Sequence, residues 1–236
     1  HQCAKRAAHQ AGITKGVVVS DAMNKNDAMS LHGETNLNGA INLDDAVTNA
    51  AAVLRAGGAA VFPTDTVYGL GVAVGSCASP QQLFAIKRRD EGKPVAWLVG
   101  GVHDLDAYGK DVPAWARTAA KKHWPGALTL IVCASGAVPA AFQSAQGTIG
   151  LRMPNSDIAL SLIRAVGTPL ATTSANISGA PAPSRDAQLD PELLKQANAV
   201  VRGIDCVGGE GVASTVVDCT GEHPVVLRQG SITITE

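Results

Sequence analysis

The stretch AAVFPTDTVYGLGVAV, residues 59–74, decides the fold. Residues 59–62 are four apolar residues in a row, which predicts a short strand buried on both faces. Pro63 stops this strand because proline cannot donate to a sheet ladder, and residues 70–74 predict a second buried strand. The loop between them offers two threonines and an aspartate directly after a buried strand. An ordinary turn can have the same composition, so this loop alone does not identify a site.

Helical and strand patterns alternate along the chain on both sides of this stretch. Asn42 precedes Asp45 and a run of apolar residues at helical spacing, which predicts an N-capped helix that ends at Gly57. Further helices are predicted from the cap Ser79 with Pro80 in the first turn to about Arg88, over residues 111–124, after Asn155 as a cap, and near residues 191–198. Further strands are predicted at residues 95–99, 127–134, 148–153, 170–173, 200–204, 215–218 and 225–228. The alternation is irregular and some links are short, so we expect an α/β fold with a twisted, mixed parallel and antiparallel sheet flanked by helices.

The composition suits one large domain or one domain plus an extension, because the chain has 236 residues. Hydrophobic residues make up 46% and aromatic residues only 3%, so the core is expected to be aliphatic. Residues 1–42 are polar and rich in turn formers, although residues 17–19 could form a short strand. We therefore expect an N-terminal extension of unknown role over residues 1–42 and the regular domain over residues 43–236.

Charge and cysteine usage narrow the class of protein. The net charge of −1 excludes a strongly basic protein, so a nucleic-acid contact would need a local patch. The five cysteines show no C-x-x-C spacing, which favours reduced thiols over a disulfide framework. Metal-ligand spacing is also missing from the sequence. The sequence has no apolar run of the roughly 20 residues that a membrane span needs and no signal-peptide core, so a cytoplasmic protein without a membrane contact is expected.

Three further polar segments follow predicted elements. The charged run over residues 87–94 comes at a helix C-terminus, where cations often only complement the helix dipole. Helical spacing separates Lys87 and Arg89 from Arg88, and a lysine with an arginine can together hold a triphosphate. Phosphate loops of the G-x-x-x-x-G-K-S/T kind and G-x-G-x-x-G turns are missing, so ATP would bind by an uncommon route.

The other two segments adjoin predicted strands. Period-two spacing places Thr148, Gly150 and Arg152 on one strand face, where a buried arginine is costly unless it is paired with an anion. A substrate carboxylate would satisfy Arg152, and so would a structural Asp or Glu. Ser174 and Asn176 supply short donors and acceptors after a strand, although an ordinary turn can look the same.

Six strings in the same order and spacing resemble the YrdC/Sua5 family of threonylcarbamoyl-adenylate synthases, in its short single-domain form. They are residues 62–71 (FPTDTVYGLG), Lys87-Arg-Arg89 with Pro94, residues 124–129 (WPGALT), residues 150–154 (GLRMP), Ser174-Ala-Asn176, and Ser214-Thr215 followed by Leu227-Arg228. The resemblance implies a sheet with a large concave cavity. It also implies an enzyme, a nucleotidyltransferase that joins L-threonine, bicarbonate and ATP with Mg²⁺ into threonylcarbamoyl-AMP. A tRNA-modifying threonylcarbamoyl-transferase complex would receive the product.

The same resemblance implies roles for eleven residues. Thr66, Arg152, Thr172 and Ser214 would bind threonine, with Arg152 on its carboxylate. ATP or the bicarbonate-derived carboxylate would contact Lys87, Arg89, Lys93, Thr148, Ser174, Asn176 and Arg228. Of these, Lys87, Arg89, Ser174 and Asn176 would act in catalysis.

Two other functions compete with this interpretation. YrdC-like domains also occur in carbamoyl-transfer enzymes, which use carbamoyl phosphate. Some members of the family bind double-stranded RNA, and Lys87, Arg88, Arg89, Lys93, Lys121 and Lys122 could form one basic patch for a possible RNA contact.

Overall fold

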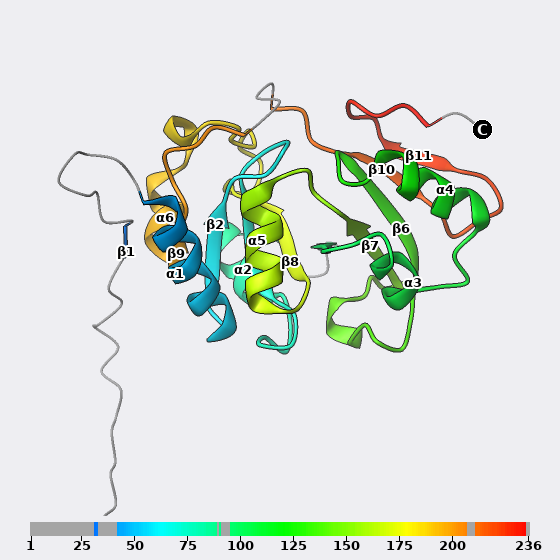
Figure 1. Cartoon of the computed structure of the whole chain (residues 1–236), viewed down its shortest axis with the longest axis horizontal. Coiled ribbons are helices and arrows are strands. Elements are labelled where there is room, and N and C mark those ends of the chain that lie inside the picture. Colours follow the sequence, from blue (N-terminus) through cyan, green and yellow to red (C-terminus); the bar gives the residue numbers. More distant parts are fainter. Residues whose placement is uncertain (1–30, 33–41, 89, 91–94, 207–210, 235–236) are drawn as a thin grey trace, which may run out of the picture.

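One mixed sheet organises the molecule, with helices on both of its faces (Figure 1). The computed structural model describes residues 31–32, 42–88, 90, 95–206 and 211–234. Its strands are β1 (Leu31–His32), β2 (Ala59–Phe62), β3 (Gly69–Ala73), β4 (Ala96–Leu98), β5 (Gly109–Lys110), β6 (Leu128–Ala134), β7 (Thr148–Arg152), β8 (Leu170–Ser174), β9 (Ala199–Val200), β10 (Thr215–Asp218) and β11 (Val225–Arg228). Its α-helices are α1 (Leu43–Arg55), α2 (Gln81–Lys87), α3 (Asp104–Tyr108), α4 (Ala114–His123), α5 (Asp157–Val166) and α6 (Pro191–Gln196).

The strand order confirms the predicted mixed sheet. It runs β1-β9-β2-β3-β8-β4-β7-β6-β10-β11, with β5 paired to β6. The pairs β1–β9, β2–β9, β4–β7 and β6–β10 are parallel, and the other pairs are antiparallel. The sheet therefore mixes parallel and antiparallel pairs, as the irregular sequence pattern indicated.

The register of the central strands brings distant polar segments together. Phe62 lies opposite Gly69, and Gly69 lies opposite Ser174, so the loop between β2 and β3 and the segment after β8 share one end of the sheet. On the next strands, Ala96 pairs with Thr172, and Leu98 pairs with Arg152. A substitution at Gly71 would disturb this packing, because an added Cβ would lie 2.9 Å from Oγ1 of Thr172.

Two hydrophobic clusters lie on opposite faces of the sheet. Alternation along β2 sends Ala60 and Phe62 to the cluster that α1 and α5 cover, and Ala59 and Val61 to the other. The second, larger cluster takes in side chains of α2, α3, α4 and α6. Helices thus bury both faces, which explains why β2 and β3 are buried along their whole length.

Two predicted helix caps are wrong, and in each the cap lies one residue further on. Helix α2 has Pro80 at its N-cap without a side-chain cap bond, because Oγ of Ser79 bonds to the side chain of Gln81 instead. Helix α5 is capped by Ser156, not Asn155: Oγ of Ser156 accepts from the Ala159 N–H (3.3 Å) and donates to the Pro63 carbonyl (3.2 Å). The asparagine cap at Asn42 is confirmed, since its side chain accepts from the Asp45 N–H.

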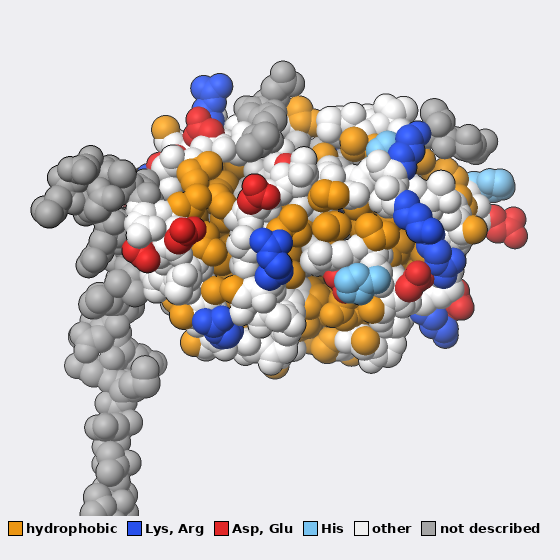
Figure 2. Space-filling model, in the orientation of Figure 1, with side chains coloured by type: hydrophobic (Ala, Val, Ile, Leu, Met, Phe, Trp, Pro, Cys, Tyr) orange, Lys and Arg blue, Asp and Glu red, His pale blue; other side chains and the backbone are white. Residues whose placement is uncertain are grey.

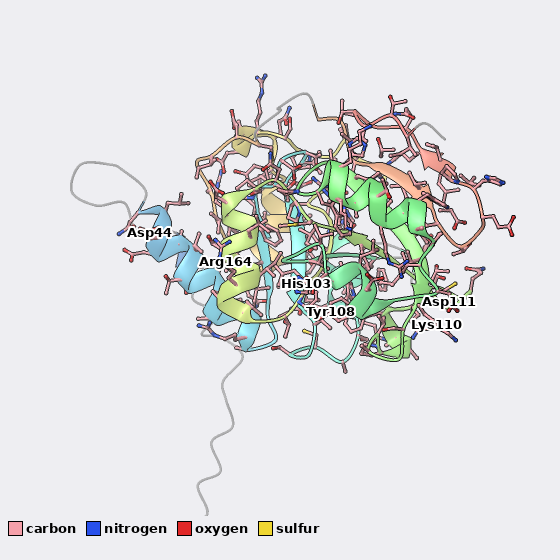
Figure 3. The ribbon with its side chains drawn as sticks, turned by 45° about the vertical axis from the view of Figure 1, so that its right-hand side comes forward. Asp44, His103, Tyr108, Lys110, Asp111 and Arg164 are labelled. Atoms are coloured by element: carbon pink, nitrogen blue, oxygen red, sulfur yellow. The ribbon has the colours of Figure 1, made fainter. Side chains whose placement is uncertain are left out.

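The segment before α4 differs from the predicted helix over residues 111–124. Helix α4 begins only at Ala114, because Asp111 has a positive φ of 53° and Pro113 occupies the N-cap in an extended conformation. The short helix α3 and strand β5 were not predicted, and Figure 3 labels Tyr108 at the end of α3, Lys110 in β5 and Asp111 directly after it.

Some expectations lie outside the described residues, among them the possible strand at residues 17–19 and most of the expected extension. Of that extension the structure describes β1, which pairs with β9 at the edge of the sheet. Within the described residues, every helix is too short or too polar to span a lipid bilayer.

Candidate active site

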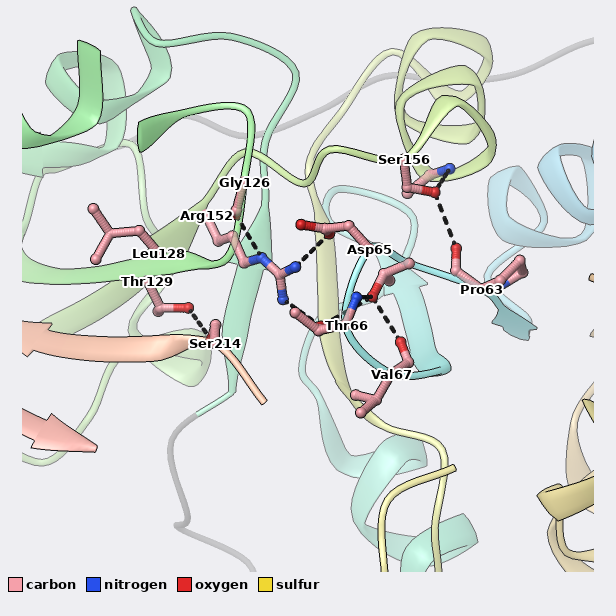
Figure 4. Close-up of polar contacts among 12 residues, drawn as sticks. Pro63, Asp65, Thr66, Val67, Gly126, Leu128, Thr129, Arg152, Ser156 and Ser214 are labelled. Atoms are coloured by element: carbon pink, nitrogen blue, oxygen red, sulfur yellow. Dashed lines mark hydrogen bonds and ion pairs between the residues drawn. The ribbon is translucent and has the colours of Figure 1, made fainter. Parts of the chain in front are cut away.

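A cavity of about 410 Å³ opens where the central strands end. Seven of the eleven residues expected in the site line it: Thr66, Thr148, Arg152, Thr172, Ser174, Ser214 and Arg228. They come from five different strands or strand ends, so the cavity exists only because the sheet register assembles it. Figure 4 shows the part of this site around Arg152.

Arg152 lies at the end of β7 with a side chain only 8% exposed. Its Nε donates to the Gly126 carbonyl (3.1 Å), its Nη1 donates to Oγ1 of Thr66 (3.0 Å), and its Nη2 forms an ion pair with Asp65 (Figure 4). Burial lowers the pKa of Arg152, the charge of Asp65 raises it, and nearby Arg228 lowers it further. A structural aspartate therefore pairs with this buried arginine, which is one of the two alternatives that the sequence left open.

The guanidinium of Arg152 nevertheless keeps donors for a ligand. A guanidinium has five N–H groups, and the three bonds above use one each, which leaves two. Since Arg152 lines the cavity, these two can meet a carboxylate there. Asp65 was not among the expected site residues, although it stands inside the quoted loop beside Thr66.

The hydroxyl of Thr66 faces the cavity as an acceptor. Thr64 donates its only hydroxyl proton to the Val67 carbonyl (2.6 Å). The contact between the Thr64 and Thr66 hydroxyls (3.2 Å) must therefore take its proton from Thr66. Thr66 has then used its own proton, and its oxygen can only accept further bonds.

Thr172 is restricted in the same way. Its hydroxyl donates to the Leu170 carbonyl within β8 at 2.9 Å. Its oxygen lines the cavity with lone pairs only. Together Thr66 and Thr172 form a part of the wall that suits a group with N–H or O–H donors, such as an amine.

Thr148 has the opposite polarity. The hydroxyl oxygen of Ser144 accepts from the backbone N–H groups of Gln146 and Thr148 (3.2 Å each). Both of its lone pairs are then used, so Ser144 donates its proton across the 2.7 Å contact to Oγ1 of Thr148. The proton of Thr148 is left for the cavity, where it suits an anionic oxygen.

Ser214 and Arg228 close another side of the cavity. Arg228, on β11, donates from Nε to the Ser214 carbonyl (2.9 Å) and from Nη2 to its hydroxyl (3.0 Å). Ser214 also contacts the hydroxyl of Thr129 at 2.8 Å. Thr129 is buried, lines the cavity and was not predicted as a site residue. Its only signal in the sequence was its place in the string at residues 124–129.

Lys87, Ser174 and Asn176 lie together, as expected. Lys87 is only 3% exposed, and its Nζ bonds to the carbonyl and hydroxyl of Ser174 and to Oδ1 of Asn176 (3.1 Å). The amide nitrogen of Asn176 donates to the carbonyls of Ile177 (3.1 Å) and Ala180 (2.6 Å). Lys87 and Asn176 do not line the main cavity; they fix the shape of the segment that carries Ser174.

The helix that carries Lys87 is shorter than expected. Helix α2 ends at Lys87, and Arg88 takes a left-handed conformation with φ of 50°. Arg89 and Lys93 lie outside the described residues. The buried position of Lys87 also removes it from the expected basic patch.

The described residues do not fit a resident magnesium site. No group of three or more His, Cys, Asp or Glu side chains among them could hold a metal ion. Asp65, the carboxylate beside Arg152, is already paired.

The family model Sua5_yciO_yrdC, described as "Telomere recombination", matches residues 52–230. The chain belongs to this family. This matches the resemblance seen in the sequence, and the matched range contains all eleven expected site residues.

Three relatives show how far the similarity extends. The chain is 37% identical over 185 residues to the threonylcarbamoyl-AMP synthase of Bacillus subtilis, covering 78% of this chain and 53% of the relative. The crystal structure of Pyrococcus abyssi Sua5 complexed with L-threonine has a TM-score of 0.72 and 36% identity, and covers 81% of this chain and 55% of that one. Escherichia coli YciO has a TM-score of 0.71 and 27% identity, with 81% and 92% covered. The chain thus spans about half the length of the first two relatives.

Proposed function

We propose that this protein is an L-threonylcarbamoyladenylate synthase, a nucleotidyltransferase that converts L-threonine, bicarbonate and ATP into threonylcarbamoyl-AMP and pyrophosphate. The observation that carries the proposal is the convergence of seven expected residues on one cavity, with a buried arginine at its wall. The relatives named above support the choice of substrates, because one is a threonylcarbamoyl-AMP synthase and another was crystallised with L-threonine.

Hydroxyl polarity supports an orientation for threonine. The two remaining N–H groups of Arg152 would take its carboxylate. The acceptor oxygens of Thr66 and Thr172 would take the N–H groups of its amine. Ser214, next to Arg228, would complete the threonine-binding wall.

The reaction needs no covalent enzyme intermediate. The amine nitrogen of threonine attacks bicarbonate, water is lost, and N-carboxy-threonine forms. One oxygen of this carboxylate attacks the α-phosphorus of ATP, the bond to the bridging oxygen of the β-phosphate breaks, and pyrophosphate leaves with that electron pair. The protein would act mainly by holding the unstable carbamate and the α-phosphate together, which shortens the search for a reactive geometry.

Cations and hydroxyl donors would hold the nucleotide. The free proton of Thr148 and the guanidinium of Arg228 suit phosphate or carbamate oxygens. Lys87 and Asn176 would position Ser174 for the same purpose, and Arg89 and Lys93 would add phosphate contacts. Magnesium bound to ATP would neutralise part of the phosphate charge.

We further propose the domain bounds of the enzyme, its location and the partner that receives its product. Residues 43–236 would be the catalytic domain, and residues 1–42 an extension. The enzyme would work in the cytoplasm, where ATP and tRNA are available. A separate tRNA-modifying threonylcarbamoyl-transferase complex would use the product.

A direct product analysis tests this function. The protein is mixed with ATP, Mg²⁺, bicarbonate and threonine, and the mixed anhydride is sought by mass spectrometry together with released pyrophosphate. Pyrophosphate release that depends on both threonine and bicarbonate is expected. Turnover that requires carbamoyl phosphate and ignores threonine would support the carbamoyl-transfer alternative and contradict the proposal.

The RNA-binding alternative finds less support in the structure. Lys87 is buried, and on the face that Figure 2 shows, the basic side chains that lie together form one narrow strip at the right, over α4. A contact through Lys121 and Lys122, which are exposed on α4, would be local. RNA binding that weakens steeply with salt, without any adenylate product, would favour this alternative.

A further inference from the structure

Gly150 stands in the middle of β7 and lines the main cavity. Thr148 and Arg152 lie two residues away on the same face of the strand and line the cavity as well. Ile149 and Leu151 alternate with them and pack into the larger hydrophobic cluster on the opposite face. The face of β7 toward the cavity therefore carries two polar side chains with a gap between them.

Neither the backbone nor the packing of β7 requires a glycine at this position. Gly150 belongs to a regular strand and is not among the glycines with positive φ. An added Cβ would lie 3.4 Å from Cγ2 of Thr129 and 3.5 Å from Cβ of Ala96, which are ordinary van der Waals contacts. Gly69 differs, because a Cβ there would lie only 2.8 Å from Cγ2 of Thr172. Packing thus explains Gly69, whereas the effect of Gly150 is to leave space free in the cavity.

This free space has a cost in stability. A glycine inside a strand loses more backbone entropy on folding than other residues and adds no side chain to the sheet. Valine, by contrast, is favoured in strands. A strand glycine often marks a place where a ligand approaches the backbone closely. At Gly150 that approach is possible, because the cavity lies above it.

Gly150 lies midway between the two ends of the proposed reaction. Arg152 would take the carboxylate of threonine, and Thr148 would donate to an anionic oxygen at the nucleotide end. A strand rises about 3.3 Å per residue, so each of them lies roughly 6.6 Å from Gly150 along β7. Ala96 extends this floor on β4 and pairs with Thr172, which would accept from the amine.

We propose that Gly150 keeps the path between the two substrates open, and that the N-carboxylate of threonine and the α-phosphate of ATP meet above its backbone. A side chain at position 150 would separate these two groups without filling either end of the cavity. Threonine and ATP would then still bind singly, whereas a molecule that spans both ends would not. This inference rests on the proposed function and adds the position of the chain over which the reacting groups meet.

Gly150→Val is the principal test. The methyl groups of valine extend one C–C bond, about 1.5 Å, beyond Cβ, and a misplacement of about 1 Å can cost about 100-fold in rate. Gly150→Val should therefore lower kcat at least 100-fold, and Gly150→Ala should lower it less. The matched control is Gly136→Val, the same substitution outside both cavities, where an added Cβ has nothing within 4 Å. This control should keep the native kcat.

Binding and stability separate this role from a structural one. The urea midpoint of Gly150→Val should equal or exceed that of the native protein, because valine suits a strand better than glycine does. Its dissociation constants for threonine alone and for ATP alone, measured by calorimetry, should stay within threefold of the native values. A native kcat in Gly150→Val, or a loss of more than tenfold in the binding of either substrate alone, would overturn the inference.

A stable analogue of threonylcarbamoyl-AMP, with NH in place of the bridging anhydride oxygen, tests the same idea without turnover. Gly150→Val should bind this analogue at least 100-fold more weakly than the native protein and the Gly136→Val control do. Gly150→Ala, which adds a single methyl group, should show a smaller loss in the same direction. Equal binding of the analogue by the native protein and Gly150→Val would contradict the inference. If the native protein binds the analogue but forms no adenylate, the proposed function fails, and the binding constants of the variants still decide the role of Gly150.

Discussion

Arg152 contributes to the fold and to the candidate site through one guanidinium group. Three of its N–H groups hold the Gly126 carbonyl, Thr66 and Asp65, and all of these contacts are buried or nearly so. A buried arginine without its aspartate would be an uncompensated charge. The ion pair therefore fixes the direction in which the two remaining N–H groups point.

Removal of the Asp65 carboxylate should destabilise the protein strongly. Asp65→Ala should lower the free energy of unfolding by about 3–5 kcal/mol, because it leaves the charge of Arg152 buried and unpaired. The control is Glu192→Ala, which breaks the Glu192–Lys195 pair whose side chains are 62% and 69% exposed. This control should shift the urea midpoint far less than Asp65→Ala does, because solvent screens an exposed pair. Equal urea midpoints for the two variants would show that the buried Asp65–Arg152 pair stabilises the protein no more than the exposed Glu192–Lys195 pair.

The direction of the hydroxyl bonds predicts which substrate each threonine serves. Thr148→Val removes a donor and should raise the KM for ATP about tenfold, while Thr66→Val removes an acceptor and should raise the KM for threonine by a similar factor. Each variant serves as the control for the other, since valine has nearly the shape of threonine. Steady-state kinetics with each substrate varied in turn measures both constants. A rise in the same KM for both variants would contradict the assignment of Thr148 to ATP and of Thr66 to threonine.

Residue types and spacing could predict most of the residues of this site, but not the hydrogen bonds and ion pairs among them. Arg152 on an inner strand face was identifiable from period-two spacing, and the need for an anionic partner followed from burial alone. The identity of that partner, Asp65, depends on which strands lie between β2 and β7, and that order is not local information. Thr129 and its bond to Ser214 escaped prediction for the same reason, because the pairing of β6 with β10 joins residues 85 positions apart.

At the scale of elements, strands were easier to predict than helix ends. Apolar runs identified β2, β3, β6, β7, β8, β10 and β11 to within a residue or two. Helix starts were shifted at α2, α4 and α5: at α2 the Ser79 hydroxyl bonds to the nearby Gln81 side chain, and at α4 the left-handed Asp111 and Pro113 delay the start. At α5 the deciding contact is the bond from Ser156 to the Pro63 carbonyl, 93 residues away.

The cap of α5 gives a direct test of this explanation. Ser156→Ala should lower the free energy of unfolding by about 1–2 kcal/mol, because it removes both the cap bond and the bond to Pro63. Asn155→Ala is the matched control and should change it by less than about 0.5 kcal/mol. Urea unfolding of both variants measures the difference. A larger loss of unfolding free energy in Asn155→Ala than in Ser156→Ala would show that Asn155 caps α5, as the sequence predicted.

For the whole molecule, the burial of two thiols should make the free energy of unfolding fall at alkaline pH. The four described cysteines are free, as expected from their spacing. Burial raises the pKa of Cys206 to about 11 and that of Cys219 to about 12, and both side chains belong to the larger hydrophobic cluster. In the unfolded chain a thiol has a pKa of about 8.5.

The sign of the effect follows from proton counting. Below about pH 8 both states keep these thiol protons, so the full stability is present. Between about pH 9 and 11 the unfolded chain loses protons that the native protein keeps, and the free energy of unfolding should fall by about 1 kcal/mol per pH unit for each thiol. Urea unfolding at pH 8, 9 and 10 measures this slope. The Cys206→Ala/Cys219→Ala variant should have a lower stability at pH 8 but a shallower decline, because tyrosines and lysines titrate in both proteins alike. A decline as steep as that of the native protein would show that the alkaline loss arises from other groups.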